Sequence, residues 1–300
     1  STLYVTLEPC CHSGKTPPCT DRIIQHQIAR VVIGAVDSNP LVSCQGINGL
    51  QRAGIEIKTG VLEDECRDLN EIFFHFMETG LPFVTVKYAQ TLDGRIATAT
   101  GQSQWISSPE SLKFAHQLRA EHDAILVGIG TILKDNPALT VRRVRGRNPL
   151  RIIVDSNLAI TTKANVMQNL SKTPTLIVTT QKASNPHFQI LAGAGAELIT
   201  VDPDESNRVN LKKLLQILAV RKISSILIEG GSQMITSILK DNLVNRLVTV
   251  IAPKILGKGV EAVGDLNIRD LKNAKILSVR AVSKKGVDVI IDSRLMPSAH

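Results

Sequence analysis

Aromatic residues are scarce in this sequence: Phe, Trp and Tyr together make up 3% of its 300 residues. Proteins that bind single-stranded nucleic acid stack the bases on aromatic side chains, so this scarcity argues against such a surface. The chain also lacks an apolar run near the ~20 residues of a membrane-spanning helix, and no signal peptide is visible. We therefore expect a cytoplasmic protein that binds neither nucleic acid nor a membrane.

Cysteines are few, and their number does not suit a set of disulfides. The five residues, an odd number, are Cys10, Cys11, Cys19, Cys44 and Cys66, which favours free thiols in a reducing compartment. The formal net charge is +8. A solvated basic surface would explain this charge without any partner, whereas a functional interpretation points to phosphorylated small molecules as substrates. The sequence leaves the oligomeric state open, including a homo-oligomer.

The chain divides near Gly80-Leu81-Pro82, which predicts a first domain over 1–80 and a second over 81–300. A length of 300 residues corresponds to about two domains. The first domain alternates strand-like runs with helical segments, which is typical of an α/β fold. We expect strands at 3–7, 31–36 and 56–59, and helices at 20–29, 46–53 and 62–78.

The second domain continues the α/β pattern and then changes. We expect strands at 83–89, 124–128, 151–155, 175–179, 197–201 and 224–228, with helices at 108–119, 210–220 and 232–240. From 246 to 292 the sequence predicts strands without helices between them, and Lys284-Lys285-Gly286 predicts a hairpin turn between 276–282 and 287–291. An α/β sheet that ends in antiparallel strands differs from the ordinary doubly wound order.

The segment from Glu8 to Cys19, Glu-Pro-Cys-Cys-His-Ser-Gly-Lys-Thr-Pro-Pro-Cys, places two cysteines at the edges of expected elements. Cys10 follows a strand-like run, and Cys19 lies at a helix start, where the partial positive charge favours a thiolate. Zinc deaminases use a proline-cysteine and a second cysteine as two of their metal ligands. We therefore expect Cys10 and Cys19 to bind Zn²⁺.

The rest of a deaminase zinc site is missing from the sequence. Zinc deaminases take a third ligand and a general acid/base from a His-x-Glu element, but His75-Phe76-Met77-Glu78 has the wrong spacing for it. His12 could supply a third ligand, but it crowds Cys10, and we favour a role beside the metal or the substrate. The simpler alternative is that Cys10 and Cys19 are only small hydrophobic residues of the core.

Two glycine pairs in the second domain follow strand-like runs. One lies in Val127-Gly128-Ile129-Gly130-Thr131, and the other in Glu229-Gly230-Gly231-Ser232. Glycines let a ligand approach the backbone closely, and the N–H groups at a helix start bind phosphate. Two such strand ends side by side could hold a dinucleotide, although the Gly-x-Gly-x-x-Gly fingerprint is absent. Each pair on its own is more often a tight turn.

Longer motifs follow one another over nearly the whole chain. They are Thr6–His12, Thr16–Cys19, Lys87–Arg95, Ser103–Ile106, His116–Arg119, Asp123–Thr131, Asp135–Thr140, Val154–Ser156 and Glu229–Gly231. In this order they resemble the bifunctional deaminase/reductase family of riboflavin biosynthesis. The resemblance implies a cytidine-deaminase-like domain, without its amino-terminal part and the His-x-Glu element, followed by a reductase domain like dihydrofolate reductase.

The resemblance also implies two consecutive reactions. In the first, zinc-bound hydroxide deaminates 2,5-diamino-6-(5-phosphoribosylamino)pyrimidin-4-one. In the second, NADPH reduces the ribosyl group of the product to a ribityl chain. Both substrates carry a phosphate, which suits the basic charge of the chain.

Roles for individual residues follow from their positions in the family's motifs, with Cys10 and Cys19 matching the zinc ligands. The positions that match NADPH contacts are Ala89, Trp105, Thr131, Asp135, Ser156, Gly231 and Ser232. The positions that match substrate contacts are Ser103, Arg119, Leu139, Arg142 and Glu229. We predict catalytic roles for Asp135 and for Lys87, which interrupts an otherwise buried-looking strand. Arginine suits a sugar phosphate because its guanidinium offers a planar fork of donors.

Plainer interpretations exist for several of these residues and for the whole chain. Trp105 would usually be a core residue, Arg119 a helix-end charge and Asp135 a turn cap. The zinc half-site also occurs in nucleic-acid-editing deaminases, here fused to a nucleotide-binding domain, and a zinc-stabilised binding protein is a third class. The eight residues between Cys10 and Cys19, in place of the usual two, count against an editing deaminase.

Overall fold

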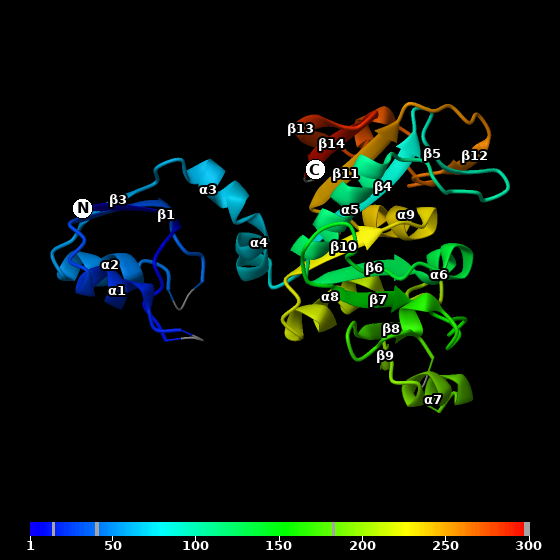
Figure 1. Ribbon diagram of the computed structural model, residues 1–300, viewed down its shortest axis with the longest axis horizontal. Coiled ribbons are helices and arrows are strands. Elements are labelled where there is room, and N and C mark those ends of the chain that lie inside the picture. Colours follow the sequence, from blue (N-terminus) through cyan, green and yellow to red (C-terminus); the bar gives the residue numbers. More distant parts are fainter. Residues whose placement is uncertain (14–15, 40–41, 182–183, 297–300) are drawn as a thin grey trace. The chain divides into compact units, whose positions relative to one another are not determined.

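The structure divides the chain into two compact units, Ser1–Leu81 and Pro82–His300 (Figure 1). It is a computed structural model that describes residues 1–13, 16–39, 42–181 and 184–296. Gly14 and Lys15 of the cysteine-bearing segment lie outside the described residues. Just before the boundary, Gly80 takes a left-handed φ of 67° and ends a helix.

The first unit contains a three-stranded parallel sheet in the order β1-β2-β3. Its elements are β1 (Thr2–Leu7), α1 (Cys19–Gln25), β2 (Arg30–Ala35), α2 (Gln45–Arg52), β3 (Glu56–Thr59), α3 (Glu63–Leu69) and α4 (Glu71–Thr79). Ile23 of α1 and Ile47 and Leu50 of α2 pack with Val31 and Ile33 of the central strand. The helices that connect the parallel strands therefore cover the sheet with their apolar residues.

The helix predicted over 62–78 is wrong as a single element, because the chain forms two helices, α3 and α4, with Asn70 between them. Asn70 has a φ of −107°, and its side-chain Nδ2 donates to the carbonyl of Cys66 at 2.8 Å. An asparagine side chain competes in this way with the backbone hydrogen bonds of a helix. The apolar periodicity continues across Asn70, so the sequence pattern gave no sign of the break between the two helices.

A buried carboxylate fixes the loop after β1 against α2. Glu8 is 3% exposed, and its two oxygens accept from the backbone N–H groups of Cys44, at 3.0 Å, and Ile47, at 3.1 Å. These N–H groups lie at the start of α2, where they have no partner within the helix. The side chain thereby positions Pro9 and Cys10 beside the helix start.

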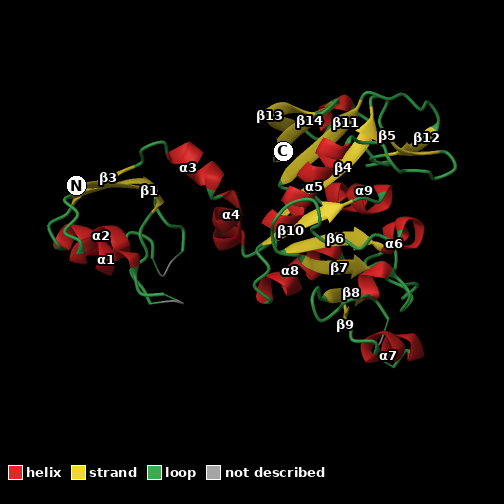
Figure 2. Ribbon diagram, viewed as in Figure 1, coloured by secondary structure: helices red, strands yellow, loops and turns green. Residues whose placement is uncertain are grey.

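The second unit is built on a nine-stranded sheet in the order β13-β14-β11-β4-β10-β6-β7-β8-β9 (Figure 2). Its elements before residue 200 are β4 (Phe83–Thr91), β5 (Arg95–Thr98), α5 (Pro109–Glu121), β6 (Ala124–Gly128), α6 (Ile129–Asp135), β7 (Leu150–Val154), η1 (Asn165–Met167), β8 (Thr175–Thr179), α7 (Pro186–Gly193) and β9 (Glu197–Thr200). Those after it are α8 (Leu211–Val220), β10 (Ser225–Glu229), α9 (Ser232–Lys240), β11 (Arg246–Ala252), β12 (Gly259–Glu261), η2 (Leu271–Asn273), β13 (Leu277–Lys285) and β14 (Asp288–Leu295).

The end of the sheet is antiparallel, as the sequence predicted. Strand β11 runs parallel to β4, whereas β14 pairs antiparallel with β11 and β13 antiparallel with β14. The predicted hairpin turn is shifted, because Lys284 and Lys285 belong to β13, and the chain turns at Gly286 and Val287. Gly286 has a φ of 62°, a left-handed conformation that glycine adopts without strain.

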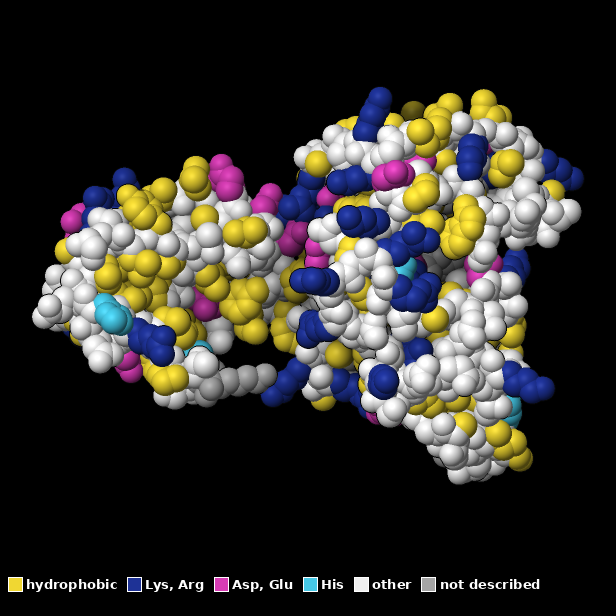
Figure 3. Space-filling model, in the orientation of Figure 1, with side chains coloured by type: hydrophobic (Ala, Val, Ile, Leu, Met, Phe, Trp, Pro, Cys, Tyr) yellow, Lys and Arg dark blue, Asp and Glu magenta, His cyan; other side chains and the backbone are white. Residues whose placement is uncertain are grey.

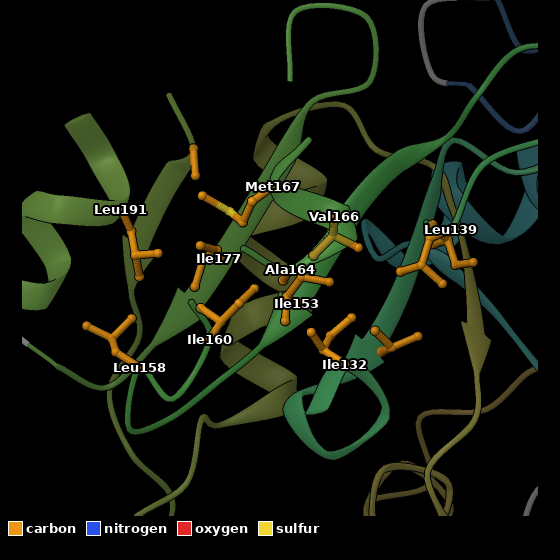
Figure 4. Close-up of a cluster of buried hydrophobic side chains, with 13 residues drawn as sticks. Ile132, Leu139, Ile153, Leu158, Ile160, Ala164, Val166, Met167, Ile177 and Leu191 are labelled. Atoms are coloured by element: carbon orange, nitrogen blue, oxygen red, sulfur yellow. The ribbon is translucent and has the colours of Figure 1, made fainter. Parts of the chain in front are cut away.

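Helices cover both faces of the large sheet. Ile132 of α6 and Leu191 of α7 pack on Ile125, Ile153 and Ile177 of the sheet, in the cluster drawn in Figure 4. Leu118 of α5 packs on Leu227 of β10. Leu227 lies beside Ile125 of β6 in the sheet, so α5 covers the same face. On the opposite face, a side chain at Gly128 would meet Met234 of α9. Among the described residues, every helix is too short or too polar to span a bilayer.

Two glycines of α2 provide a matched test of the packing around Pro9. A Cβ at Gly46 would lie 2.1 Å from the backbone oxygen of Pro9, whereas a Cβ at Gly49 would meet nothing within 4 Å. Alanine favours a helix interior by about 1 kcal/mol over glycine. We expect Gly49→Ala to raise the thermal midpoint and Gly46→Ala to lower it, measured by circular dichroism. Equal stabilisation by both variants would contradict the contact between α2 and the loop.

Candidate active site

A cleft of about 1590 Å³ opens in the second unit at the carboxyl ends of β4, β6, β7 and β10. Figure 3 shows Lys and Arg side chains gathered on the visible face of this unit. Every residue that the sequence analysis assigned to the reductase lines this cleft. These are Lys87, Ala89, Ser103, Trp105, Arg119, Thr131, Asp135, Leu139, Arg142, Ser156, Glu229, Gly231 and Ser232.

The register of the sheet brings the charged residues of the cleft together. Lys87 on β4 is the direct neighbour of Glu229 on β10, so both side chains lie on the same face of the sheet. Helix α5 packs on that face through Leu118. Arg119 therefore reaches Glu229 although the two are far apart in the sequence.

Arg119 and Glu229 form a bidentate ion pair that is largely buried. Arg119 Nε donates to Glu229 Oε1 at 2.7 Å, and Nη2 donates to Oε2 at 2.6 Å. Each side chain is 13% exposed. Burial would raise the pKa of Glu229, but the charge and hydrogen bonds of Arg119, with the charge of Lys87, hold that pKa below its usual value. We predicted that the Arg119 guanidinium binds a sugar phosphate and that Glu229 holds sugar hydroxyls. In the structure, the two side chains bind each other instead.

Lys87 is a buried amine at the floor of the cleft, with 9% of its surface exposed. Burial lowers the pKa of Lys87, and the positive charge of Arg119 lowers it further. The carboxylates of Glu229 and Asp288 oppose this shift without cancelling it. The ammonium group consequently releases a proton more readily than an exposed lysine does.

Helix α5 also clamps the segment that carries Arg142. Arg119 Nη1 donates to the carbonyl of Thr140 at 3.2 Å, and one turn earlier His116 Nδ1 accepts from the backbone N–H of Arg142 at 3.0 Å. Burial lowers the pKa of His116 to about 4, together with the charges of Arg119 and Arg142. No role for His116 follows from the sequence motifs, although its spacing from Arg119 on a predicted helix puts both side chains on one face.

Arg142 and Leu139 of this segment differ in what they offer a ligand. The Arg142 side chain is exposed, and its Nη1 donates to Thr140 Oγ1 at 2.9 Å, so the guanidinium stays accessible in the cleft. Leu139 is 2% exposed and belongs to the hydrophobic core. Its φ of 53° bends the backbone at this point.

Three further predicted residues lie at the mouth of the cleft. Ser103 Oγ donates to Asp135 Oδ1 at 3.2 Å, so a predicted substrate residue and a predicted catalytic residue contact each other. Trp105 is 62% exposed, which excludes the core position that a single tryptophan would usually take. Lys254 Nζ donates to the Trp105 carbonyl at 2.8 Å and fixes the backbone there.

The two glycine-bearing strand ends meet in the same cleft, where the Thr131 side chain faces Gly231. Gly230 and Gly231 have φ values of 80° and 79°, and a Cβ at Gly231 would lie 3.1 Å from Thr131 Oγ1. Ser232 begins α9 directly after them, and Ser156 follows β7 further along the cleft. Exposed backbone N–H groups at such strand ends can bind a pyrophosphate, so the residues present fit a dinucleotide.

The two cysteines predicted to bind zinc come together in the first unit, where Cys19 N donates to Cys10 Sγ at 3.3 Å. Cys19 is the first residue of α1, as expected, but its pKa is raised by the hydrogen bond with Cys10 and by burial, against the opposing charge of Arg22. The expected preference for a thiolate is therefore outweighed. Among the described residues, no group of three His, Cys, Asp or Glu side chains converges as a metal ion requires.

The sheet order and the cleft at its carboxyl edge define an α/β domain of the nucleotide-binding class. Residues 82–287 match the family described as RibD C-terminal domain. The riboflavin biosynthesis protein RibD of Aquifex aeolicus is 44% identical over 292 residues, which make up 97% of this chain and 80% of that protein. The chain belongs to the RibD family of riboflavin biosynthesis, and its second unit is the reductase domain of that family.

Solved structures agree with this assignment. The diaminohydroxyphosphoribosylaminopyrimidine deaminase/5-amino-6-(5-phosphoribosylamino)uracil reductase of Thermotoga maritima is 36% identical with a TM-score of 0.84, and the match covers 98% of this chain and 79% of that one. RibD of Acinetobacter baumannii is 30% identical with a TM-score of 0.86, over 99% and 81%. The α/β fold class is confirmed, and these relatives leave the nucleic-acid-editing alternative without support.

We expect the stability of the second unit to suffer when only one member of the Arg119–Glu229 pair is removed. Removing one partner leaves a buried charge alone, so Arg119→Met or Glu229→Met should each cost about 3–5 kcal/mol of unfolding free energy. The double variant should lose much less, because neither charge remains. Far-ultraviolet circular dichroism in denaturant reports the unfolding. As a control, Lys213→Met breaks the exposed pair with Asp202 and should change little. Additive losses in the double variant would contradict a direct pair.

Proposed function

We propose that the second unit reduces 5-amino-6-(5-phosphoribosylamino)uracil, with NADPH as the reductant, and converts its ribosyl group to a ribityl chain. The observation that carries this proposal is one continuous cleft that joins the glycine pair at Gly230 and Gly231 to the buried charges around Lys87. A cofactor at one end and a polar, water-poor pocket at the other are what hydride transfer to a sugar carbon needs.

NADPH would lie along the glycine-bearing strand ends and supply the hydride. Gly231, Ser232 and Thr131 surround the space suited to its pyrophosphate, and Ser156 lies where the adenosine half would extend. Ala89 projects from β4 on the same face as Lys87, two residues away, and its small side chain leaves room for a flat ring. Exposed Trp105 offers an aromatic surface at the mouth of the cleft.

The substrate phosphate would bind at Arg142, whose guanidinium is accessible where that of Arg119 is not. Arg119 and Glu229 hold the wall of the pocket, and Glu229 keeps lone pairs that can accept from sugar hydroxyls. Ser103 and Asp135, already in contact, lie between the predicted cofactor and substrate regions. Asp135 would thereby align the reacting sugar carbon, and Leu139 would contribute through its backbone.

Lys87 supplies the titratable proton of this pocket. Opening the ribose ring leaves an alkoxide that must be protonated, and an ammonium with a lowered pKa, held at Nζ in a buried pocket, is suited to give that proton. Glu229 beside it stays charged and limits how far the pKa of Lys87 falls. We assign Lys87 and Asp135 as the catalytic residues on this basis.

The cofactor assignment is tested with valine variants of two glycines that have similar positive φ angles, Gly231 and Gly257. Gly231→Val should abolish NADPH binding and NADPH oxidation, because its side chain fills the space for the pyrophosphate. Gly257 also has a positive φ, 71°, but lies outside the cleft, so Gly257→Val brings comparable backbone strain without filling the site. Binding is followed by nicotinamide fluorescence and turnover by absorbance with the phosphoribosylaminouracil. Retained binding in a folded Gly231→Val variant, or no substrate-dependent oxidation by the wild type, contradicts the proposal.

We propose in addition that the first unit belongs to the deaminase part of the family and that Cys10 and Cys19 are two thiolate ligands of a zinc ion. Their approach across the α1 start supports this pairing. Zn²⁺ in a catalytic site takes three protein ligands, and the described residues supply two, so we derive no deamination step.

This assignment predicts the metal content of the chain. Two cysteines alone hold zinc weakly, so the 300-residue chain should contain well under one zinc per molecule after dialysis and should release no ammonia from the diaminopyrimidine substrate. Metal analysis by mass spectrometry and an ammonia assay check both. A chain with one tightly held zinc would show that a third ligand comes from within it, with His12 the first candidate for replacement.

A further inference from the structure

His116 has one nitrogen that is occupied and one that is free to bind a ligand. Nδ1 accepts from the backbone N–H of Arg142 at 3.0 Å, so in the neutral ring the proton resides on Nε2. Among the described residues, Nε2 has no hydrogen-bond partner, and His116 lines the cleft although only 5% of its surface is exposed. His116 Nε2 can therefore donate to a ligand that enters the cleft.

We propose that His116 Nε2 donates a hydrogen bond to a phosphate oxygen of the substrate, beside the guanidinium of Arg142. The inference rests on the proposed reduction of a ribose phosphate and adds a binding residue to it. The same imidazole holds the Arg142 backbone through Nδ1, so one side chain places the arginine and completes the phosphate site.

Two contacts from α5 fix the geometry of this site. His116 and Arg119 lie one helical turn apart and reach the same segment, His116 at the N–H of Arg142 and Arg119 at the carbonyl of Thr140. Thr140 Oγ1 in turn accepts from Arg142 Nη1 at 2.9 Å. The donors that remain are the rest of the Arg142 guanidinium and His116 Nε2, and both face the cleft.

Burial and the charges around His116 keep it a neutral donor. Burial lowers the pKa of His116 most, Arg119 on its own helix and Arg142 and Arg143 on the facing segment lower it further, and Glu229 on β10 acts in the opposite sense. A neutral imidazole with Nδ1 occupied can only donate from Nε2. This suits a fully deprotonated phosphate, which accepts hydrogen bonds and offers no proton.

Two amide substitutions separate the two nitrogens of His116. In His116→Asn, the side-chain oxygen can replace Nδ1 as the acceptor for Arg142, but no donor reaches the position of Nε2. In His116→Gln, the longer amide can place an N–H near that position. A lost hydrogen bond to a charged group of this strength corresponds to about a 10- to 100-fold change in affinity.

We therefore expect His116→Asn to raise the KM for the phosphoribosylaminouracil about 10- to 100-fold, with kcat and the KM for NADPH nearly unchanged. His116→Gln should stay within a few-fold of the wild type. The dephosphorylated riboside should show no difference between wild type and His116→Asn, because it lacks the acceptor. His187→Asn is the control for loss of a histidine hydrogen bond in this unit, since His187 Nε2 contacts the Ile160 carbonyl outside the cleft.

Binding of ribose 5-phosphate, measured by calorimetry, separates this inference from the proposed reaction. The wild type should bind it and His116→Asn should bind it about 10- to 100-fold more weakly, whether or not the enzyme turns over. Equal affinities of the two proteins would overturn the inference. So would damage in His116→Gln with His116→Asn unaffected, since that pattern belongs to a residue that only holds the Arg142 backbone. Failure of the wild type to oxidise NADPH overturns the proposed reaction alone.

Discussion

The buried ion pair between Arg119 and Glu229 is the constraint on which the cleft depends. Neither charge could remain alone in a site where each side chain is 13% exposed, so each requires the other. The pair joins α5 to the end of β10 and, through Arg119 Nη1, to Thr140. Because apolar residues often replace such a pair without loss of stability, its value here lies in fixing three separate segments in one geometry.

Other properties of the cleft follow from this pair. Glu229 faces Lys87 across neighbouring strands and limits the fall in the pKa of Lys87 that burial and Arg119 cause. Burial lowers the pKa of His116, and the charge of Arg119 lowers it further. The two residues together position the segment that ends in Arg142. A change at either member of the pair would at once alter the lysine that we propose as proton donor, a neutral histidine and the arginine that we propose for phosphate binding. The reactive groups of this site are thus coupled through one contact.

Local patterns predicted most strands and missed those with little apolar sequence of their own. The expected strands at 124–128 and 175–179 and the helix at 232–240 match β6, β8 and α9 residue for residue, because apolar residues mark them and a glycine or proline lies at one end of each. The three- and four-residue strands β12 and β5 went unpredicted, since they pair with each other and have little pattern of their own. Asn70 broke a helix through a side-chain hydrogen bond that periodicity does not reveal.

At the site, the sequence motifs indicated which residues to consider, whereas only the tertiary structure shows which of them contact each other. Motifs identified the residues of the cleft, and all of them line it, but they did not indicate which ones pair. Arg119 was expected to bind phosphate because its fork of donors suits that ligand, yet the same fork suits Glu229, and the strand register places Glu229 within reach. Because Glu229 already occupies the donors of Arg119, the phosphate site that we propose uses donors one turn away on α5 and on the segment that α5 holds. These donors are Nε2 of His116 and the exposed guanidinium of Arg142.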